Sequence, residues 1–145
     1  MRSGSVPRLS LAILMMAAAA SAPRARADDA LYRDLGRRAT LERIVADAVA
    51  RWVADARIAD TFDNLNLDRF KRRLTDQLCE LAGGPCHYTG RNMYLTHKGL
   101  HLDIVQFNAL VEDLQDAMDQ ERVPFRTQNR LLAILAPMKR DIVTR

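Results

Sequence analysis

The chain is poor in the residues from which most metal-binding and catalytic motifs are built. It has two cysteines and three histidines (His87, His97 and His101) in 145 residues, and no Cys-x-x-Cys pair, so the ligand spacing of a zinc site is absent. Among its six glycines, Gly83-Gly84 is not followed by a Lys-Ser/Thr step, which excludes a phosphate-binding loop. No Gly-x-Ser-x-Gly elbow occurs, so the sequence offers no support for a nucleophilic or zinc-dependent enzyme.

Strand signals are also scarce, because β-branched residues never alternate with polar ones over a useful length. Apolar residues recur instead with helical spacing, and no internal repeat interrupts them. The length suffices for one core, so we expect one all-α domain. The sequence predicts four main helices: 40–56 with Thr40 as N-cap, 67–82 ended by Gly83-Gly84-Pro85, one opened by Asp103, and one with Pro124 in its first turn. Their expected core faces include Val53 and Ile104.

The first 27 residues have the layout of a secretory signal peptide. A basic start precedes an apolar run of about 14 residues (LSLAILMMAAAASA), and Ala25-Arg26-Ala27 supplies the small residues of a cleavage site. The run is shorter than the roughly 20 residues of a membrane-spanning helix. We expect cleavage after Ala27, leaving a domain of residues 28–145 that is periplasmic or secreted and not attached to a membrane. An uncleaved anchor or a misassigned start codon is the alternative.

The excess positive charge is confined to that leader. Residues 1–27 carry four arginines and no acid, so 18 of the 22 basic residues remain to balance 18 acidic ones. The mature chain has no basic block or aromatic-interleaved stripe, and we expect no nucleic-acid partner. Export would also place Cys79 and Cys86 in an oxidising compartment, where a pair of cysteines can be bridged.

Between Pro85 and Leu102 the helical period is lost. This stretch is long for a plain connector, and long irregular stretches are typically functional loops. It contains His97. A single histidine in a loop is more often exposed or bonded to the backbone than bound to a metal, so the residue alone does not indicate a site.

The sequence of the loop resembles the group I truncated hemoglobins. Residues 83–97 read GGPCHYTGRNMYLTH, which contains the family's GGP, YTG and M-x-x-x-H elements. The likeness extends to LYRDLG at 31–36, Phe62, Phe107 and LAP at 135–137, and so spans nearly the whole mature chain. It implies a two-over-two helical sandwich around a haem b group, with His97 as the axial ligand of the iron.

The resemblance also implies the residues of a haem pocket. Phe62 would pack on the porphyrin, and six apolar side chains would line its proximal side and floor: Leu102, Phe107, Leu110, Leu114, Leu131 and Leu135. Arg73 would meet a haem propionate, although Lys71 or Arg72 could take that place, or all three could be a solvated face. For each apolar residue, plain core packing is the alternative.

The distal side departs from the family pattern. Val49 stands where relatives usually have a ligand-binding tyrosine, while Phe70 and Leu74 occupy two often polar positions of the distal helix. With Leu78, these residues predict an apolar distal pocket. Gln77 is the nearest polar candidate there, and a surface role for it is equally open.

These observations favour an exported haem protein that reversibly binds a diatomic gas (oxygen, carbon monoxide or nitric oxide), as in oxygen binding or transport, with an unidentified reductase as a possible partner. A haem enzyme of the nitric oxide dioxygenase or peroxidase type would need polar distal groups. A haem-free helical interaction module is the other alternative.

Cys79 and Cys86 belong to the segment that carries the resemblance, and both would survive signal cleavage. We expect a disulfide between them that ties the end of the distal helix to the loop. The alternative is a buried thiol at Cys79 and an exposed one at Cys86.

Overall fold

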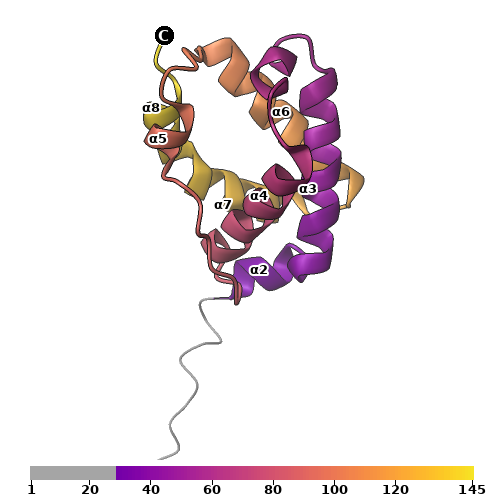
Figure 1. Ribbon diagram of the computed structural model, residues 1–145. Coiled ribbons are helices and arrows are strands. Elements are labelled where there is room, and N and C mark those ends of the chain that lie inside the picture. The colour runs from indigo at the N-terminus through magenta and orange to yellow at the C-terminus, as the bar shows by residue number, and fades with distance from the viewer. Residues whose placement is uncertain (1–28) are drawn as a thin grey trace, which may run out of the picture.

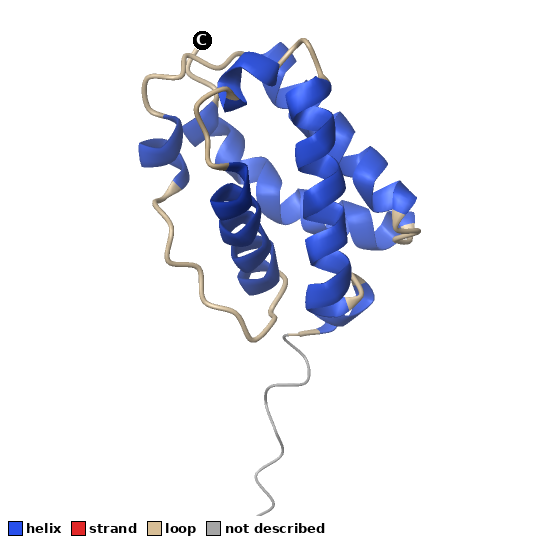
Figure 2. Ribbon diagram, turned by 45° about the vertical axis from the view of Figure 1, so that its right-hand side comes forward, coloured by secondary structure: helices blue, strands red, loops and turns tan. Residues whose placement is uncertain are grey.

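The computed structural model describes residues 29–145, so the predicted signal segment and its cleavage site lie outside the described residues. In the described part the chain forms helices and loops without a strand (Figure 2), which confirms the all-α prediction. The elements are α2 (Ala30–Asp34), α3 (Arg37–Ala54), the 3-10 turn η1 (Ala59–Phe62), α4 (Leu67–Leu81), α5 (Met93–His97), α6 (Ile104–Gln120), α7 (Phe125–Leu135), the 3-10 turn η2 (Ala136–Met138) and α8 (Lys139–Ile142). None of the helices within this range combines the length and the apolar character that crossing a membrane requires.

Helix α3 is the centre of the fold, because it packs on both α4 and α6 (Figure 1). Helix α2 contacts both α3 and α7, which brings α7 to the same end of the fold. The core face of α3 is fully apolar, as its spacing predicts, and consists of Leu41, Ile44, Val45, Ala48, Val49 and Trp52. The Trp52 indole N–H donates to the carbonyl of Leu110, 3.1 Å away, and so ties α3 to α6.

The start of α3 differs from the prediction. The helix begins at Arg37, after Gly36 with φ of +83°, and Thr40 lies within the helix rather than capping it. The Thr40 hydroxyl accepts a hydrogen bond from Arg43 at 3.0 Å. The prediction was wrong because the helix begins with Arg37 and Arg38, two charged residues that do not extend the apolar period. The left-handed turn at Gly36, which glycine adopts without steric cost, sets the true start.

Two residues assigned to the core by their spacing are not buried. Val53 is 39% exposed and Ile104 is 40% exposed. Val53 is the second-last residue of α3 and Ile104 the first of α6, so each lies at a helix end.

The stretch between Pro85 and Leu102 is not wholly irregular, because it contains the one-turn helix α5. The side chain of Asn92 caps this turn by accepting from the Leu95 amide at 2.8 Å. A helix of five residues is too short to show a period in the sequence, so the prediction of a continuous loop was wrong here. Helix α5 packs on α8, and the two lie side by side in Figure 1.

Candidate functional site

His97 is the last residue of α5 and is half-buried. Its Nδ1 atom lies 2.8 Å from the backbone carbonyl oxygen of Met93, one turn earlier. A carbonyl only accepts hydrogen bonds, so Nδ1 is the donor, and in the neutral imidazole the lone pair is then on Nε2. A neutral imidazole whose second nitrogen is held by a backbone carbonyl is the form in which histidine binds metal ions.

The other two histidines lack this arrangement. His87 is exposed, with Nδ1 3.0 Å from a carboxylate oxygen of Glu80. His101 is exposed and has a left-handed backbone with φ of +52°. Within residues 29–145 no three His, Cys, Asp or Glu side chains gather as a metal-ligand cluster.

The apolar residues assigned to the pocket fall into two groups. One group is buried by the chain itself and comprises Val49, Phe62, Leu78, Leu102, Leu114 and Leu131. The other is half-buried and comprises Phe70, Leu74, Phe107, Leu110 and Leu135. The second group comes from α4, α6 and α7, which with α5 and α8 are arranged as a ring in Figure 1. These side chains keep apolar surface that a flat apolar ligand would cover.

Phe62 and Phe70 belong to an aromatic cluster with Trp52. The ring of Phe62 stacks on Trp52 at 5.8 Å between centroids and 14° between planes. Phe70 lies 5.8 Å from Phe62 and 6.2 Å from Trp52, tilted to both. One face of Phe62 is therefore already occupied, which leaves its edge or other face for any contact with a cofactor.

Among the predicted distal residues, Gln77 alone has a polar side chain. Its amide nitrogen lies 3.7 Å from the sulfur of Met93 and so links α4 to α5. Val49 is 1% exposed and sits in the core. The residues predicted for the distal side are therefore apolar apart from one amide, which is already directed at Met93.

Arg73 points from α4 toward the loop before α5, where its guanidinium donates to the Thr89 hydroxyl. The phenol of Tyr88 is nearby: burial raises the pKa of Tyr88, and the positive charge of Arg73 partly opposes this. No acidic side chain of the described range pairs with Arg73. Lys71 lies 3.9 Å from Asp68. Arg73 thus keeps an uncompensated positive charge next to the segment that carries His97.

Cys79 and Cys86 form a disulfide with their Cα atoms 5.8 Å apart. It joins the end of α4 to the loop that leads to Thr89 and α5. Gly84 lies against this bridge, since a Cβ atom there would come within 2.6 Å of the Cys79 sulfur. A side chain at Gly84 would force the bridge or the chain to shift.

The structure adds two residues that the sequence analysis did not single out. The carbonyl oxygen of Met93 accepts a hydrogen bond from the His97 ring, and its sulfur accepts one from the Gln77 amide. The Thr89 hydroxyl accepts a hydrogen bond from the Arg73 guanidinium. The four-residue spacing of M-x-x-x-H is the one signal that could have assigned the carbonyl role, because residues i and i+4 lie on one face of a helix.

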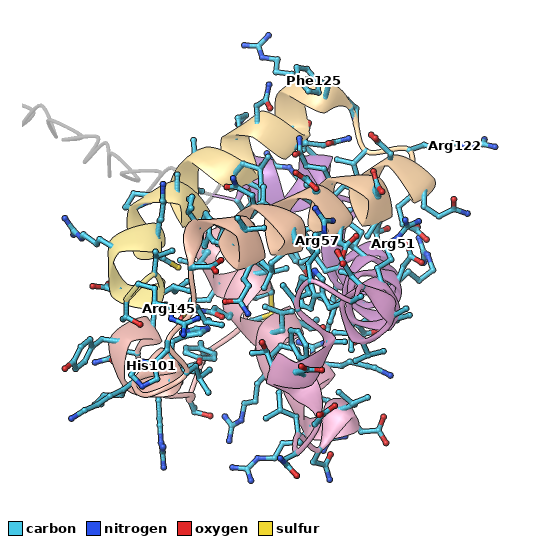
Figure 3. The ribbon with its side chains drawn as sticks, turned by 90° about the horizontal axis from the view of Figure 1, so that it is seen from above. Arg51, Arg57, His101, Arg122, Phe125 and Arg145 are labelled. Atoms are coloured by element: carbon cyan, nitrogen blue, oxygen red, sulfur yellow. A yellow bond between two sulfur atoms is a disulfide. The ribbon has the colours of Figure 1, made fainter. Side chains whose placement is uncertain are left out.

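A hollow lies at the surface between α3 and α6. It is lined by Arg51, Asp116, Asp119, Gln120 and Arg122, all of them charged or polar. Figure 3 shows Arg51 and Arg122 on the opposite side of the molecule from His101. This lining does not suit an apolar ligand.

Comparison with known proteins gives concordant matches. A family model described as bacterial-like globin matches residues 30–144. A group 1 truncated hemoglobin of Tetrahymena thermophila is 34% identical over 89 residues, covering 61% of this chain and 74% of that protein. The Tetrahymena pyriformis protein of the same name is 29% identical over 113 residues, covering 78% and 93%. The crystal structure of the Tetrahymena pyriformis truncated hemoglobin in the Fe(III) form matches with a TM-score of 0.76 and 29% identity, covering 79% of this chain and 98% of that one.

Proposed function

The chain belongs to the bacterial-like globin family, among the group 1 truncated hemoglobins, and we propose that it binds haem b through His97 and reversibly binds a diatomic gas there. The observation that carries this proposal is the hydrogen bond from His97 Nδ1 to the Met93 carbonyl at 2.8 Å. It directs the Nε2 lone pair away from the backbone and fixes the tautomer that a ferrous or ferric iron requires.

The surrounding side chains fit a haem group. The half-buried apolar residues of α4, α6 and α7 supply the dry surroundings that a porphyrin needs. Arg73 supplies a cation for a propionate, and would exchange its hydrogen bond with the Thr89 hydroxyl for a charge-assisted one. When bound, haem supplies the iron coordination position that takes the gas.

The distal residues favour gas binding over oxidative turnover. Val49, Phe70 and Leu74 offer no hydrogen-bond donor, and a dioxygenase or peroxidase relies on donors to stabilise developing charge. Gln77 would have to leave the Met93 sulfur to act as one. We therefore propose a gas-binding protein, for which oxygen, carbon monoxide and nitric oxide are the candidate ligands.

We further propose that the protein is exported and acts in the periplasm or outside the cell. The leader at residues 1–27 supports this proposal. The disulfide supports it too, because such bonds persist in oxidising compartments and are rare in the cytosol.

The visible absorption spectrum of the purified protein tests the proposal. We expect a Soret band in the ferric state that shifts on reduction with dithionite and again on addition of carbon monoxide. Absence of a Soret band after reconstitution with hemin would contradict haem binding and favour a haem-free module. Rapid turnover of nitric oxide with a reductase would favour the enzyme instead.

A further inference from the structure

The segment Met93–Leu102 holds the proposed haem ligand but has little structure of its own. Helix α5 has five residues, none of them buried. After it, Gly99 and His101 both have left-handed backbones, with φ of +86° and +52°. A helix this short is not stable alone, so the position of His97 must come from contacts with the rest of the chain.

At its start, the segment is tied to the distal helix. The Gln77 amide of α4 reaches the Met93 sulfur at 3.7 Å, and the same Met93 accepts from the His97 ring. A contact of an amide with sulfur is weak. It cannot by itself hold a segment of ten residues in place.

At its end, the segment is tied to residues more than forty positions later. The carbonyl of Leu102 accepts from the backbone amides of Thr144 at 2.9 Å and Arg145 at 3.2 Å. Leu102 is the one buried residue of the segment, at 8% exposed. Figure 3 shows Arg145 close to His101, at the same corner of the molecule.

The packing of α8 on α5 and the hydrogen bonds to Leu102 come from one continuous stretch of the chain. Helix α8 packs on α5, and the chain then leaves α8 through the extended Val143 and reaches Leu102. The segment is therefore bracketed along its length by residues 139–145. Thr144 and Arg145 have exposed side chains, so their contribution to the bracket is the backbone N–H.

We propose that the amides of Thr144 and Arg145 are positioning groups for His97: by holding Leu102 they fix the proximal segment and thereby the retention of haem. The inference rests on the proposed role of His97 as haem ligand. It assigns residues 144–145 a function that depends on their backbone amides and not on their side chains.

A pair of double variants separates the amides from the side chains. Thr144→Pro/Arg145→Pro removes both backbone N–H donors. Thr144→Ala/Arg145→Ala shortens the same two side chains but keeps both N–H donors. Val143 has φ of −82° and ψ of 114°, a conformation that a following proline accepts.

In the haem-free protein, we expect amide hydrogen exchange in residues 98–102 to be about tenfold faster in the proline pair than in the alanine pair, as loss of a hydrogen bond implies. In the haem-loaded protein, we expect haem transfer to excess apomyoglobin to be faster by a similar factor of about ten. The iron–imidazole stretching band of the ferrous protein should shift in the proline pair only, which a purely structural role of the tail would not produce.

Equal exchange rates and equal haem loss in the two pairs would overturn the inference. Failure of the unmodified protein to take up haem would overturn the proposed function instead, while the exchange comparison on the haem-free chain would still decide whether the tie positions the segment. Should the proline pair not fold, Thr144→Pro alone keeps the Arg145 amide and should give an intermediate effect. An effect equal to that of Thr144→Ala would refute the tie.

Discussion

At the scale of single residues, the chemistry of the site depends on which polar groups are already committed. His97 donates its Nδ1 proton to Met93, whereas His101, four residues later, is exposed. The Gln77 amide is directed at Met93 and the Arg73 guanidinium at Thr89. Within the described part of the chain, Nε2 of His97 and the positive charge of Arg73 have no partner of this kind. In the proposed site, they would bind the iron and a propionate of the haem.

The histidines offer the most direct prediction. Replacing His97 by alanine should abolish stable haem uptake or make it depend on added imidazole, because His97 is half-buried whereas His87 and His101 are exposed. His87→Ala and His101→Ala are the matched controls and should leave the absorption spectrum unchanged. Haem loss in His101→Ala with retention in His97→Ala would show that the ligand is misassigned.

Replacement of Val49 tests the apolar distal side. Oxygen gains more from a nearby hydroxyl donor than carbon monoxide does, by about 1.5 to 3 kcal/mol for a good hydrogen bond. Val49→Tyr should therefore slow oxygen release by about tenfold or more and change carbon monoxide release much less. Stopped-flow dissociation rates measure both.

Val49→Phe is the control for Val49→Tyr, because it adds the same ring to a core position without the hydroxyl. Oxygen release that is already slow in the unmodified protein, and unchanged by the tyrosine, would contradict the apolar assignment. Gln77 would then be the first residue to test as the missing donor.

Asp113 gives a prediction for pH dependence. Burial raises the pKa of its carboxyl, with Asp55 and Asp116 adding to the effect and Arg57 and Arg51 opposing it. One of its oxygens is buried without a hydrogen-bond partner. Because the folded pKa lies above the unfolded one, the folded state binds more protons between the two values, and stability falls as pH rises through that window.

Asp113→Asn removes this titration. Its free energy of unfolding, relative to the unmodified protein, should therefore increase as pH rises through the window between the unfolded and the folded pKa of Asp113, and stay constant above that window. Urea unfolding at several pH values measures the difference, and Asp63→Asn, at an exposed position, controls for the lost charge. A difference that shrinks with rising pH would contradict the assignment.

At the scale of elements, the segment between α4 and α6 differs most from a regular helical bundle. It consists of a disulfide-closed loop, the single turn α5 and a stretch with two left-handed residues. Such a segment contributes little to its own stability, and its position depends on neighbouring elements. Element-scale changes should therefore affect the site more than the fold.

The disulfide is the prediction at this scale. A bridge between cysteines seven positions apart should stabilise the folded state by about 2 to 3 kcal/mol through restriction of the unfolded chain. Urea unfolding with and without reductant measures the contribution, and Cys86→Ala, which has no bridge to reduce, should show no response to reductant. Intact mass after alkylation of protein from its native compartment should show no added alkyl group, and two added groups would contradict the bridge.

At the scale of the whole molecule, the charges of α3 and α6 complement each other. The predicted mature chain has equal numbers of acidic and basic residues, but α6 and its C-cap, residues 104–121, carry five acids and no base. Three arginines of α3 and the turn after it compensate this helix through ion pairs: Arg43 with Glu121, Arg51 with Asp116, and Arg57 with Glu112. These exposed pairs set charge complementarity between helices and contribute little stability each.

Export predicts the N-terminus of the mature protein. Expression with the full leader should yield a chain that begins at Asp28 and has 118 residues, that is 145 less the 27 of the leader. N-terminal sequencing and intact mass of the periplasmic or secreted fraction measure it, and Ala27→Arg, which places a large residue at the cleavage position, is the control expected to block processing. A chain that retains Met1 in that fraction would contradict cleavage.

The sequence by itself determined the four main helices and the candidate ligand residue. The apolar residues of α3 and α4 recur with helical spacing, so Trp52 and Leu78 could be assigned to the core without a structure. The loop motif singled out His97 because its residue types occur together in one short stretch. These features depend on residues that are close together in the chain, so they can be recognised from the sequence alone.

The tertiary structure alone decided which groups meet across the chain. It stacks Phe62 on Trp52, leaves Val53 at the surface and brings Thr144 to Leu102. Each outcome depends on how elements distant in sequence pack, and helical spacing gives the face of a residue without saying what covers that face. The surroundings of the candidate haem ligand are therefore a property of the fold, whereas the ligand itself is a property of the sequence.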